Sequence, residues 1–197
     1  MLCAALLAAV LPLRAQLAPS ARQVDADTVA GIVYYTRWPA ADAGARSAVR
    51  HCVAAAAGPA ALASSPPPAP TLAQALAQAL AQSAGLAGGG VALRTSSTLA
   101  PAALRDCDVV VIDGEWGDDA VRGVLRAFAE QPVLMVGFGA GFCSIGGSVC
   151  LQPGAQGTRF SINADALARS GLDIDPRALL LGRGKRRDAA GATEGAR

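Results

Sequence analysis

Hydrophobic residues recur along this chain at two different intervals, one helical and one strand-like. Near the amino-terminal end, Val29, Ile32 and Val33 are three and four residues apart, which predicts an amphipathic helix over 24–37. The Trp-Pro pair at 38–39 is expected to end this helix, because the residue before a proline avoids the α region.

Further along, strand-like and helical segments alternate. Strands are predicted at 49–56, 91–95, 107–112, 132–136 and 158–163. One helix is predicted to begin at Leu72, and another to follow Asp118 or Asp119 as its cap. Two more are predicted to begin at Ala164, after the cap Asn163, and at Pro176, after the cap Asp175. The run 107–112 is typical of a strand buried on both faces, and short strand-helix-strand connections favour a parallel crossover. The pattern therefore predicts an α/β fold, a three-layer sandwich with a mostly parallel or mixed sheet flanked by helices.

A glycine-rich loop bounded by cysteines occupies 141–150. Six residues separate Cys143 from Cys150, and they include the pair Gly146-Gly147. Because glycine takes positive φ without penalty, this pair predicts a hairpin or a tight loop. Either geometry would let the two cysteines face each other.

The ends of the chain differ in composition from its middle. The apolar run 2–13, followed by small residues, predicts a signal peptide over 1–18. No Lys or Arg precedes the run, so either the start is truncated or the signal is weak; an amino-terminal helix packed on the fold is the alternative. We expect one domain over 22–182 and a disordered basic tail over 183–197. No other stretch approaches 18 apolar residues, so no membrane span is expected in the mature form.

The charge balance argues against nucleic acid as a partner. The formal net charge is +2, but the tail over 183–197 holds five basic and two acidic residues, a net charge of +3. The rest of the chain therefore carries a net charge of −1. A body without basic excess lacks the positive stripe that phosphate backbones require.

The five cysteines divide into Cys3, inside the predicted signal peptide, and Cys52, Cys107, Cys143 and Cys150. An even set in an exported chain predicts disulfides, for which four cysteines allow three connectivities. Proximity favours Cys143 with Cys150, which leaves Cys52 with Cys107; four reduced thiols in a cytosolic core are the alternative. A zinc site is not expected, because Cys-x6-Cys exceeds the usual ligand spacing and the chain has one histidine.

Candidate catalytic patterns are incomplete. Asp113 ends a strand, as the phosphoacceptor of a response-regulator receiver does, but no lysine occurs before the tail. The glycines of 137–141 follow a strand with a spacing unlike that of a dinucleotide-binding loop. Ser144 lacks the preceding glycine of a nucleophile elbow, and Cys143 with His51 would need a free thiolate to act as a nucleophile pair. We therefore expect a non-enzyme without a cofactor or metal.

Five segments, in order, carry a resemblance to a known family. They are GIVYYTRWP, CDVVVI, RFSIN, ALARSGLDID and RALLL, and the cysteine loop lies between the second and third. Together they resemble, from 24 to 182, the YfiR family of small periplasmic proteins that restrain a membrane-bound diguanylate cyclase. The resemblance implies a periplasmic protein that represses such a cyclase and so controls cyclic di-GMP and biofilm formation. It also implies the disulfides Cys52 to Cys107 and Cys143 to Cys150.

Two functional hypotheses follow. The first is this regulator, which binds the periplasmic part of an inner-membrane diguanylate cyclase, with Cys143 and Cys150 as a labile redox pair. The second is a periplasmic small-ligand module without a cyclase partner, its pocket at the carboxyl ends of parallel strands near Asp113, Gly114 and the segment 137–139. Phe142 and Ile145 are candidates for contact with a partner or with a second copy in a homodimer, and equally for the core.

Overall fold

The computed structural model describes residues 21–39, 48–56, 70–87, 92–154 and 157–181. The predicted signal peptide over 1–18 and the predicted tail over 183–197 lie outside these residues. No helix in the described ranges combines the length and the apolar character that crossing a membrane requires.

The described residues form a six-stranded sheet with the order β3-β2-β4-β5-β6-β7. Its strands are β2 (Arg50–Ala55), β3 (Ala92–Ser96), β4 (Val109–Asp113), β5 (Leu134–Phe138), β6 (Val149–Gln152) and β7 (Arg159–Ile162). Neighbours run parallel except β6 and β7, which are antiparallel. The sheet is therefore mixed, and the predicted parallel crossover between β4 and β5 is confirmed.

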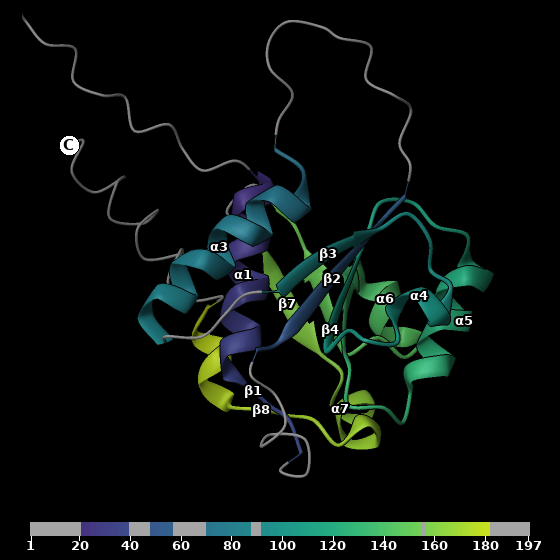
Figure 1. Cartoon of the computed structure of the whole chain (residues 1–197). Helices are drawn as coiled ribbons and strands as arrows, with labels where there is room; N and C mark the ends of the chain where they lie inside the picture. The colour runs from purple at the N-terminus through teal and green to yellow at the C-terminus, as the bar shows by residue number, and fades with distance from the viewer. Residues whose placement is uncertain (1–20, 40–47, 57–69, 88–91, 155–156, 182–197) are drawn as a thin grey trace, which may run out of the picture.

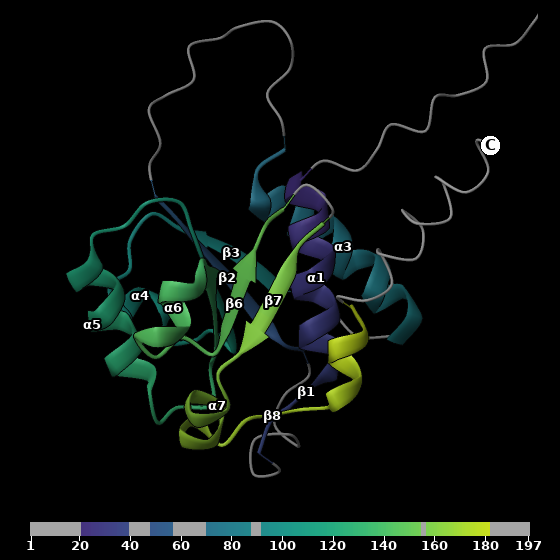
Figure 2. The same ribbon diagram turned by 180° about the vertical axis from the view of Figure 1, so that it is seen from behind.

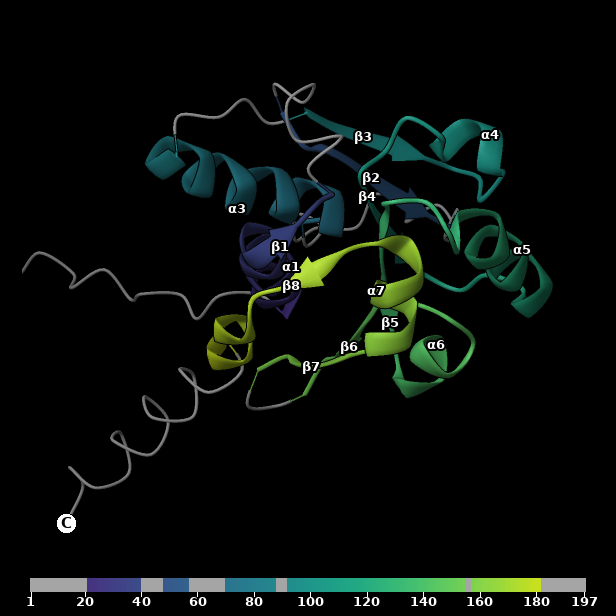
Figure 3. The ribbon, with the colours of Figure 1, turned by 90° about the horizontal axis from the view of Figure 1, so that it is seen from below.

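Helices cover both faces of this sheet (Figures 1 and 2). One face carries α1 (Ala21–Tyr35) and α3 (Leu72–Ala87), and the other carries α4 (Pro101–Leu104), α5 (Asp118–Phe128) and α6 (Ala140–Ser144). Figure 3, seen from below, shows the sheet between these two helical layers. The predicted three-layer α/β sandwich is confirmed.

The remaining elements lie toward the carboxyl end of the described chain. They are α7 (Ala164–Ser170), β8 (Asp173–Ile174) and the 3-10 helix η1 (Pro176–Leu180). β8 pairs with β1 (Thr36–Arg37) in a separate antiparallel ribbon. Through this ribbon, the carboxy-terminal segment is attached to the end of α1.

Strand β4 shows how the sheet divides the core. Val109 and Val111 pack with the α1 and α3 residues, whereas Val110 and Ile112 pack with α4, α5 and α6. This follows from the strand period of two, which turns successive side chains to opposite faces. Burial on both faces, predicted from the apolar run, is confirmed.

Several predicted caps are present, and one is corrected. The Asn163 side chain accepts a hydrogen bond from the Ala166 backbone N–H, and the Asp175 side chain accepts one from that of Arg177. The α5 N-cap is Gly117, so Asp118 lies in the first turn and is not the cap. A carboxylate is still favourable there, because the helix dipole is positive at its amino end.

Two other predictions differ from the structure. The first helix ends at Tyr35 and not at the Trp-Pro pair, because the following two residues are extended and pair with β8. Of the two alternatives predicted for 141–150, the hairpin is wrong and the tight loop is present: the segment contains most of α6, a tight turn with Gly146 at φ +112°, and the start of β6. Since β6 runs parallel to β5, the chain must cross over between them, and α6 provides the crossover.

Candidate functional site

Two disulfides connect the α4, α5 and α6 layer to the sheet. Cys52 on β2 is bonded to Cys107, which precedes β4, and Cys143 on α6 is bonded to Cys150 on β6. Their Cα to Cα distances are 5.9 and 5.8 Å. Cys143 is half-buried, whereas the other three cysteines of these two bonds are buried. This is the pairing that sequence proximity favours.

The Phe142 ring fills the space inside the cysteine loop. A Cβ atom at Gly137 would lie 2.6 Å from the ring, and one at Gly147 would lie within van der Waals overlap of it. Only glycine therefore lets the backbone of β5 and the backbone before β6 approach the ring from two sides. Phe142 is 7% exposed, so most of its surface belongs to the core.

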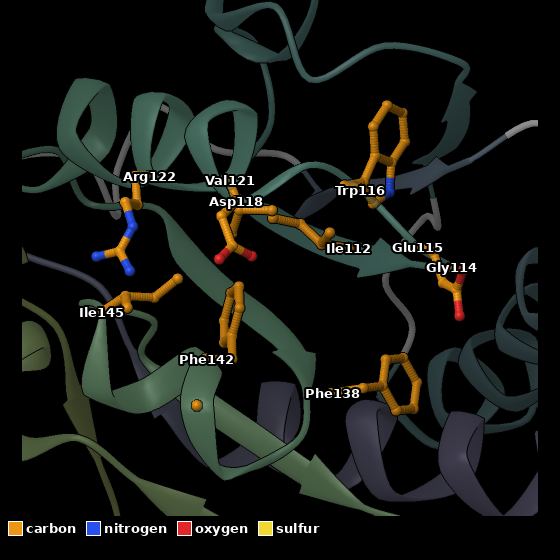
Figure 4. Close-up of a pocket in the computed structure, with 11 residues that line it drawn as sticks. Ile112, Gly114, Glu115, Trp116, Asp118, Val121, Arg122, Phe138, Phe142 and Ile145 are labelled. Carbon is orange, nitrogen blue, oxygen red and sulfur yellow. The ribbon is translucent and has the colours of Figure 1, made fainter.

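An open cavity of about 620 Å³ lies at the carboxyl ends of β4 and β5, between α5 and α6. Its apolar lining consists of Ile112, Trp116, Val121, Phe138, Phe142 and Ile145. Its charged lining consists of Glu115, Asp118 and Arg122. Figure 4 shows the α5 side chains facing Phe142 and Ile145 across this space.

The position of the cavity follows from the strand order. β2 is followed in the chain by β3 on one side of it and then by β4 on the other side, so the order reverses between β2 and β4. In open α/β sheets, ligands bind outside the carboxyl ends of the strands near such a reversal. The cavity borders this point, because Gly114 at the end of β4 lies against Ala56 at the end of β2.

An ion pair lies next to two lining residues of the cavity, Gly114 and Phe138. The Arg22 guanidinium of α1 donates to the Asp113 carboxylate at 2.7 Å and lies 5.9 Å from the centre of the Phe138 ring. The Asp113 backbone carbonyl accepts a hydrogen bond of 3.0 Å from the Trp116 indole N–H. The Asp113 carboxylate thus links the end of β4 to α1 through the ion pair with Arg22.

The structure brings together some of the predicted contact residues. Phe142 and Ile145 line the cavity, and Asp113 and Gly139 are the chain neighbours of two lining residues. Gly139 has φ +82° and is the N-cap of α6. The predicted residues therefore cluster around one end of the sheet.

Sequence reasoning missed most of the cavity lining. The sequence patterns do not single out Trp116, Glu115 or Arg122, and they give Asp118 only a capping role. One signal was available: Trp116 lies in the short loop after a buried strand, where a large aromatic residue has no helix or strand to explain it. No group of three or more His, Cys, Asp or Glu side chains in the described ranges is placed to hold a metal.

A second surface feature lies where η1 packs against α1. Tyr34, Leu179 and Leu180 are the large apolar side chains that are strongly exposed in the described part of the chain, at 69%, 52% and 56%. Asp175 lies between two guanidinium groups, with Arg37 at 2.7 Å and Arg177 at 2.9 Å. Hydrogen bonds from the Arg177 side chain and backbone, and the charge of Arg37, lower the pKa of Asp175 to about 2.

His51 is buried in the sheet. It is 4% exposed, on β2, and neither ring nitrogen makes a hydrogen bond with a described residue. Burial lowers the pKa of His51, and the nearby backbone of Ala92 and Val49 and the charge of Asp108 offset part of that shift. A neutral imidazole is therefore favoured at this position.

The comparisons with known proteins identify the group to which this chain belongs. The model of a family described as YfiR/HmsC-like matches residues 22–183. The chain belongs to the YfiR/HmsC-like family. The resemblance carried by the five sequence segments is thereby confirmed. The YfiR/HmsC-like proteins are a regulatory family, and membership supports a periplasmic regulator of cyclic di-GMP signalling.

A solved structure described as a conserved domain protein from Vibrio cholerae O1 biovar El Tor str. N16961 is also similar. The identity is 15%, the match covers 82% of this chain and 58% of that chain, and the TM-score is 0.47. The match with our YfiR/HmsC-like protein therefore spans 58% of the length of the Vibrio cholerae protein.

Proposed function

We propose that this chain binds the periplasmic part of an inner-membrane diguanylate cyclase and holds the cyclase inactive. The observation that carries the proposal is the family match over 22–183, since the family regulates cyclic di-GMP signalling. Binding lowers the production of cyclic di-GMP, and release of the cyclase raises it and promotes biofilm formation.

The junction of α1 and η1 supports a protein partner. Leu179 and Leu180 are adjacent in η1 and strongly exposed, and contiguous exposed apolar groups mark interaction sites. Arg37 and Arg177 flank this junction and are themselves exposed. We assign the cyclase contact to this surface; a second copy of the chain, in a homodimer, is the competing occupant.

The cysteine loop supports a redox response. Of the two disulfides, only Cys143 to Cys150 has a half-buried member, so a thiol reductant can reach it first. Its reduction would free α6 from β6 while the buried Cys52 to Cys107 bond stays intact. Loss of repression on reduction is therefore assigned to the Cys143 to Cys150 bond.

The first test is deletion of the gene in the bacterium that encodes it. We expect cyclic di-GMP and biofilm mass to rise, and to return to the parental level when the gene is supplied in trans. A strain that also lacks the membrane cyclase should show no rise. Unchanged cyclic di-GMP in the single deletion would contradict a repressor.

The second test concerns the surface. Leu179→Asp with Leu180→Asp should fail to complement the deletion, because two charges would have to be desolvated at the contact. Ala127→Asp, an exposed position on α5, is the control and should complement fully. Size-exclusion chromatography with light scattering then separates the two occupants: a shift from dimer to monomer in the double variant would assign the surface to self-association instead.

A further inference from the structure

The cavity between α5 and α6 has the size and walls of a small-molecule site. Its volume of about 620 Å³ lies within the range of about 300 to 1,000 Å³ that ligand pockets occupy. It is far from the α1 and η1 junction assigned to the cyclase, because it lies on the other helical layer at the carboxyl ends of β4 and β5. An occupant of this cavity is therefore separate from the proposed partner.

The aromatic walls of the cavity are held in place. The Trp116 indole is fixed by its hydrogen bond of 3.0 Å to the Asp113 carbonyl, and Phe142 is held between two glycines. Phe138 lies under the Arg22 guanidinium at 5.9 Å. Walls that do not need to be ordered on binding reduce the entropic cost of taking up a ligand.

The charges of the cavity favour one class of ligand. Glu115, Asp118 and Arg122 together carry a net charge of −1, and none of them makes an ion pair or side-chain hydrogen bond with another described residue. Figure 4 places Arg122 at the end with Ile145, Asp118 above Phe142, and Glu115 at the end with Trp116 and Phe138. The Glu115 carboxylate attracts a cation at this aromatic end, and aromatic faces add to that attraction.

The contact of Arg22 with Phe138 gives a second indication. It shows that a guanidinium is already accepted beside one of the aromatic walls, next to the Asp113 carboxylate. The Glu115 carboxylate lies at the same end of the cavity. An anionic ligand, by contrast, would meet this carboxylate at the aromatic end.

We propose that this cavity binds a small organic cation, a primary amine carried on an aromatic or branched apolar body. The apolar body lies against Phe142, Ile145 and Val121, and the ammonium group lies beside Glu115 at the end with Trp116 and Phe138. The site goes beyond the proposed regulation of a cyclase and does not depend on it.

The test is a titration calorimetry series on the purified chain with three probes of similar size and different charge. These are 2-phenylethylamine, its neutral analogue 2-phenylethanol, and the anion 3-phenylpropionate. We expect the amine to bind about tenfold more tightly than the alcohol, and the anion to bind most weakly. Equal affinities for amine and alcohol, a preference for the anion, or no binding of any probe at millimolar concentration would overturn the proposal.

Charge-removing variants locate the ammonium group. Glu115→Gln with Asp118→Asn should bring the amine down to the affinity of the alcohol, while the affinity for the alcohol stays the same. Asp119→Asn, an exposed carboxylate in the same helical turn outside the cavity lining, is the matched control and should bind like the wild type. Equal weakening by the control and the double variant would show a general charge effect and overturn the assignment.

Tryptophan fluorescence checks the location. The chain has two tryptophans, Trp38 and Trp116, and only Trp116 lines the cavity. In a Trp38→Phe background, the amine should change the emission with the same dissociation constant that calorimetry gives. Binding heat without a change in emission would place the amine elsewhere and contradict the proposal. Unchanged melting curves of the ligand-free variants verify that each one is folded.

Discussion

The two faces of the sheet are covered in different ways. On one face, α1 and α3 are 15 and 16 residues long and bury a continuous apolar surface that includes Val29, Ile32 and Leu76. On the other face, α5 has 11 residues but α4 and α6 have only four and five, and both disulfides lie there. The two longest helices and the covalent links thus occur on opposite sides of the same sheet.

The difference shows what each kind of layer needs. A helix of four or five residues forms too few backbone hydrogen bonds to offset its nucleation, so it depends on its surroundings. The disulfides hold the segments that carry α4 and α6 close to the sheet. The layer of α4, α5 and α6 also leaves the carboxyl ends of β4 and β5 partly uncovered, and the cavity forms there.

The largest expected effect is the loss of the longer disulfide loop. Replacing Cys52 and Cys107 together by Ala should lower the free energy of unfolding by about 4 kcal/mol, as the unfolded chain regains the freedom of a long loop. Replacing Cys143 and Cys150 together should cost about 2.5 kcal/mol, because the loop is short. Urea unfolding at neutral pH measures both. The reverse order would show that contacts inside the glycine loop outweigh loop entropy.

On the face without disulfides, truncating one buried side chain should lower the free energy of unfolding by a comparable amount. Leu76 is fully buried on α3, so Leu76→Ala should cost about 3 kcal/mol through lost burial and the cavity left behind. Gln78→Ala, exposed on the same helix, is the control and should change the stability by less than about 0.5 kcal/mol. A small effect at Leu76 would mean that the α3 layer contributes little to stability.

Much of this architecture could be predicted because its signals are local. The valines of β4, the Leu72 helix and the caps Asn163 and Asp175 depend on neighbours within a few residues, and the structure contains all of them. The pairing of β1 with β8 could not be predicted, because each strand has two residues and their partners are distant in the chain.

The cavity was harder to predict than the fold. Its aromatic walls come from three places: Phe138 from the end of β5, Trp116 from the loop after β4, and Phe142 from α6. Their spacing in the sequence has no helical or strand period. The sequence drew attention to Phe142 and Ile145 through the cysteines beside them. Whether Phe142 belongs to the core depends on Gly137 as well as Gly147, and only the folded chain brings these glycines together.

The next prediction in order of size tests the contact between Gly147 and the Phe142 ring. Gly147→Ala places a Cβ atom where the Phe142 ring lies, so we expect a loss of about 2 kcal/mol in the free energy of unfolding. Gly123→Ala, in α5 with open space around it, is the control and should be neutral or stabilising by up to about 1 kcal/mol. Adding Phe142→Leu to Gly147→Ala should recover part of the loss. Strictly additive effects would contradict a direct clash.

The smallest expected effect is a dependence on acid. The folded pKa of His51 lies below its unfolded value, so this residue contributes stability above about pH 6.5 that is lost as the pH falls. Urea unfolding at about pH 7.5 and about pH 5 should show this loss in the wild type and a smaller one in His51→Gln. Asp175 does not interfere, because with a pKa of about 2 it loses its contribution only below about pH 4. Identical pH slopes in both proteins would exclude His51 as the cause.

The placement of Phe142 between two glycines has a consequence for the history of this family. A side chain can appear at position 137 or 147 only if the ring at 142 shrinks or turns away, since the three positions share one volume. Relatives should therefore change these positions together, with a smaller residue at 142 wherever either glycine has been replaced. Such a substitution also enlarges or reshapes the neighbouring cavity, so drift at a backbone position can alter which molecules a relative accommodates.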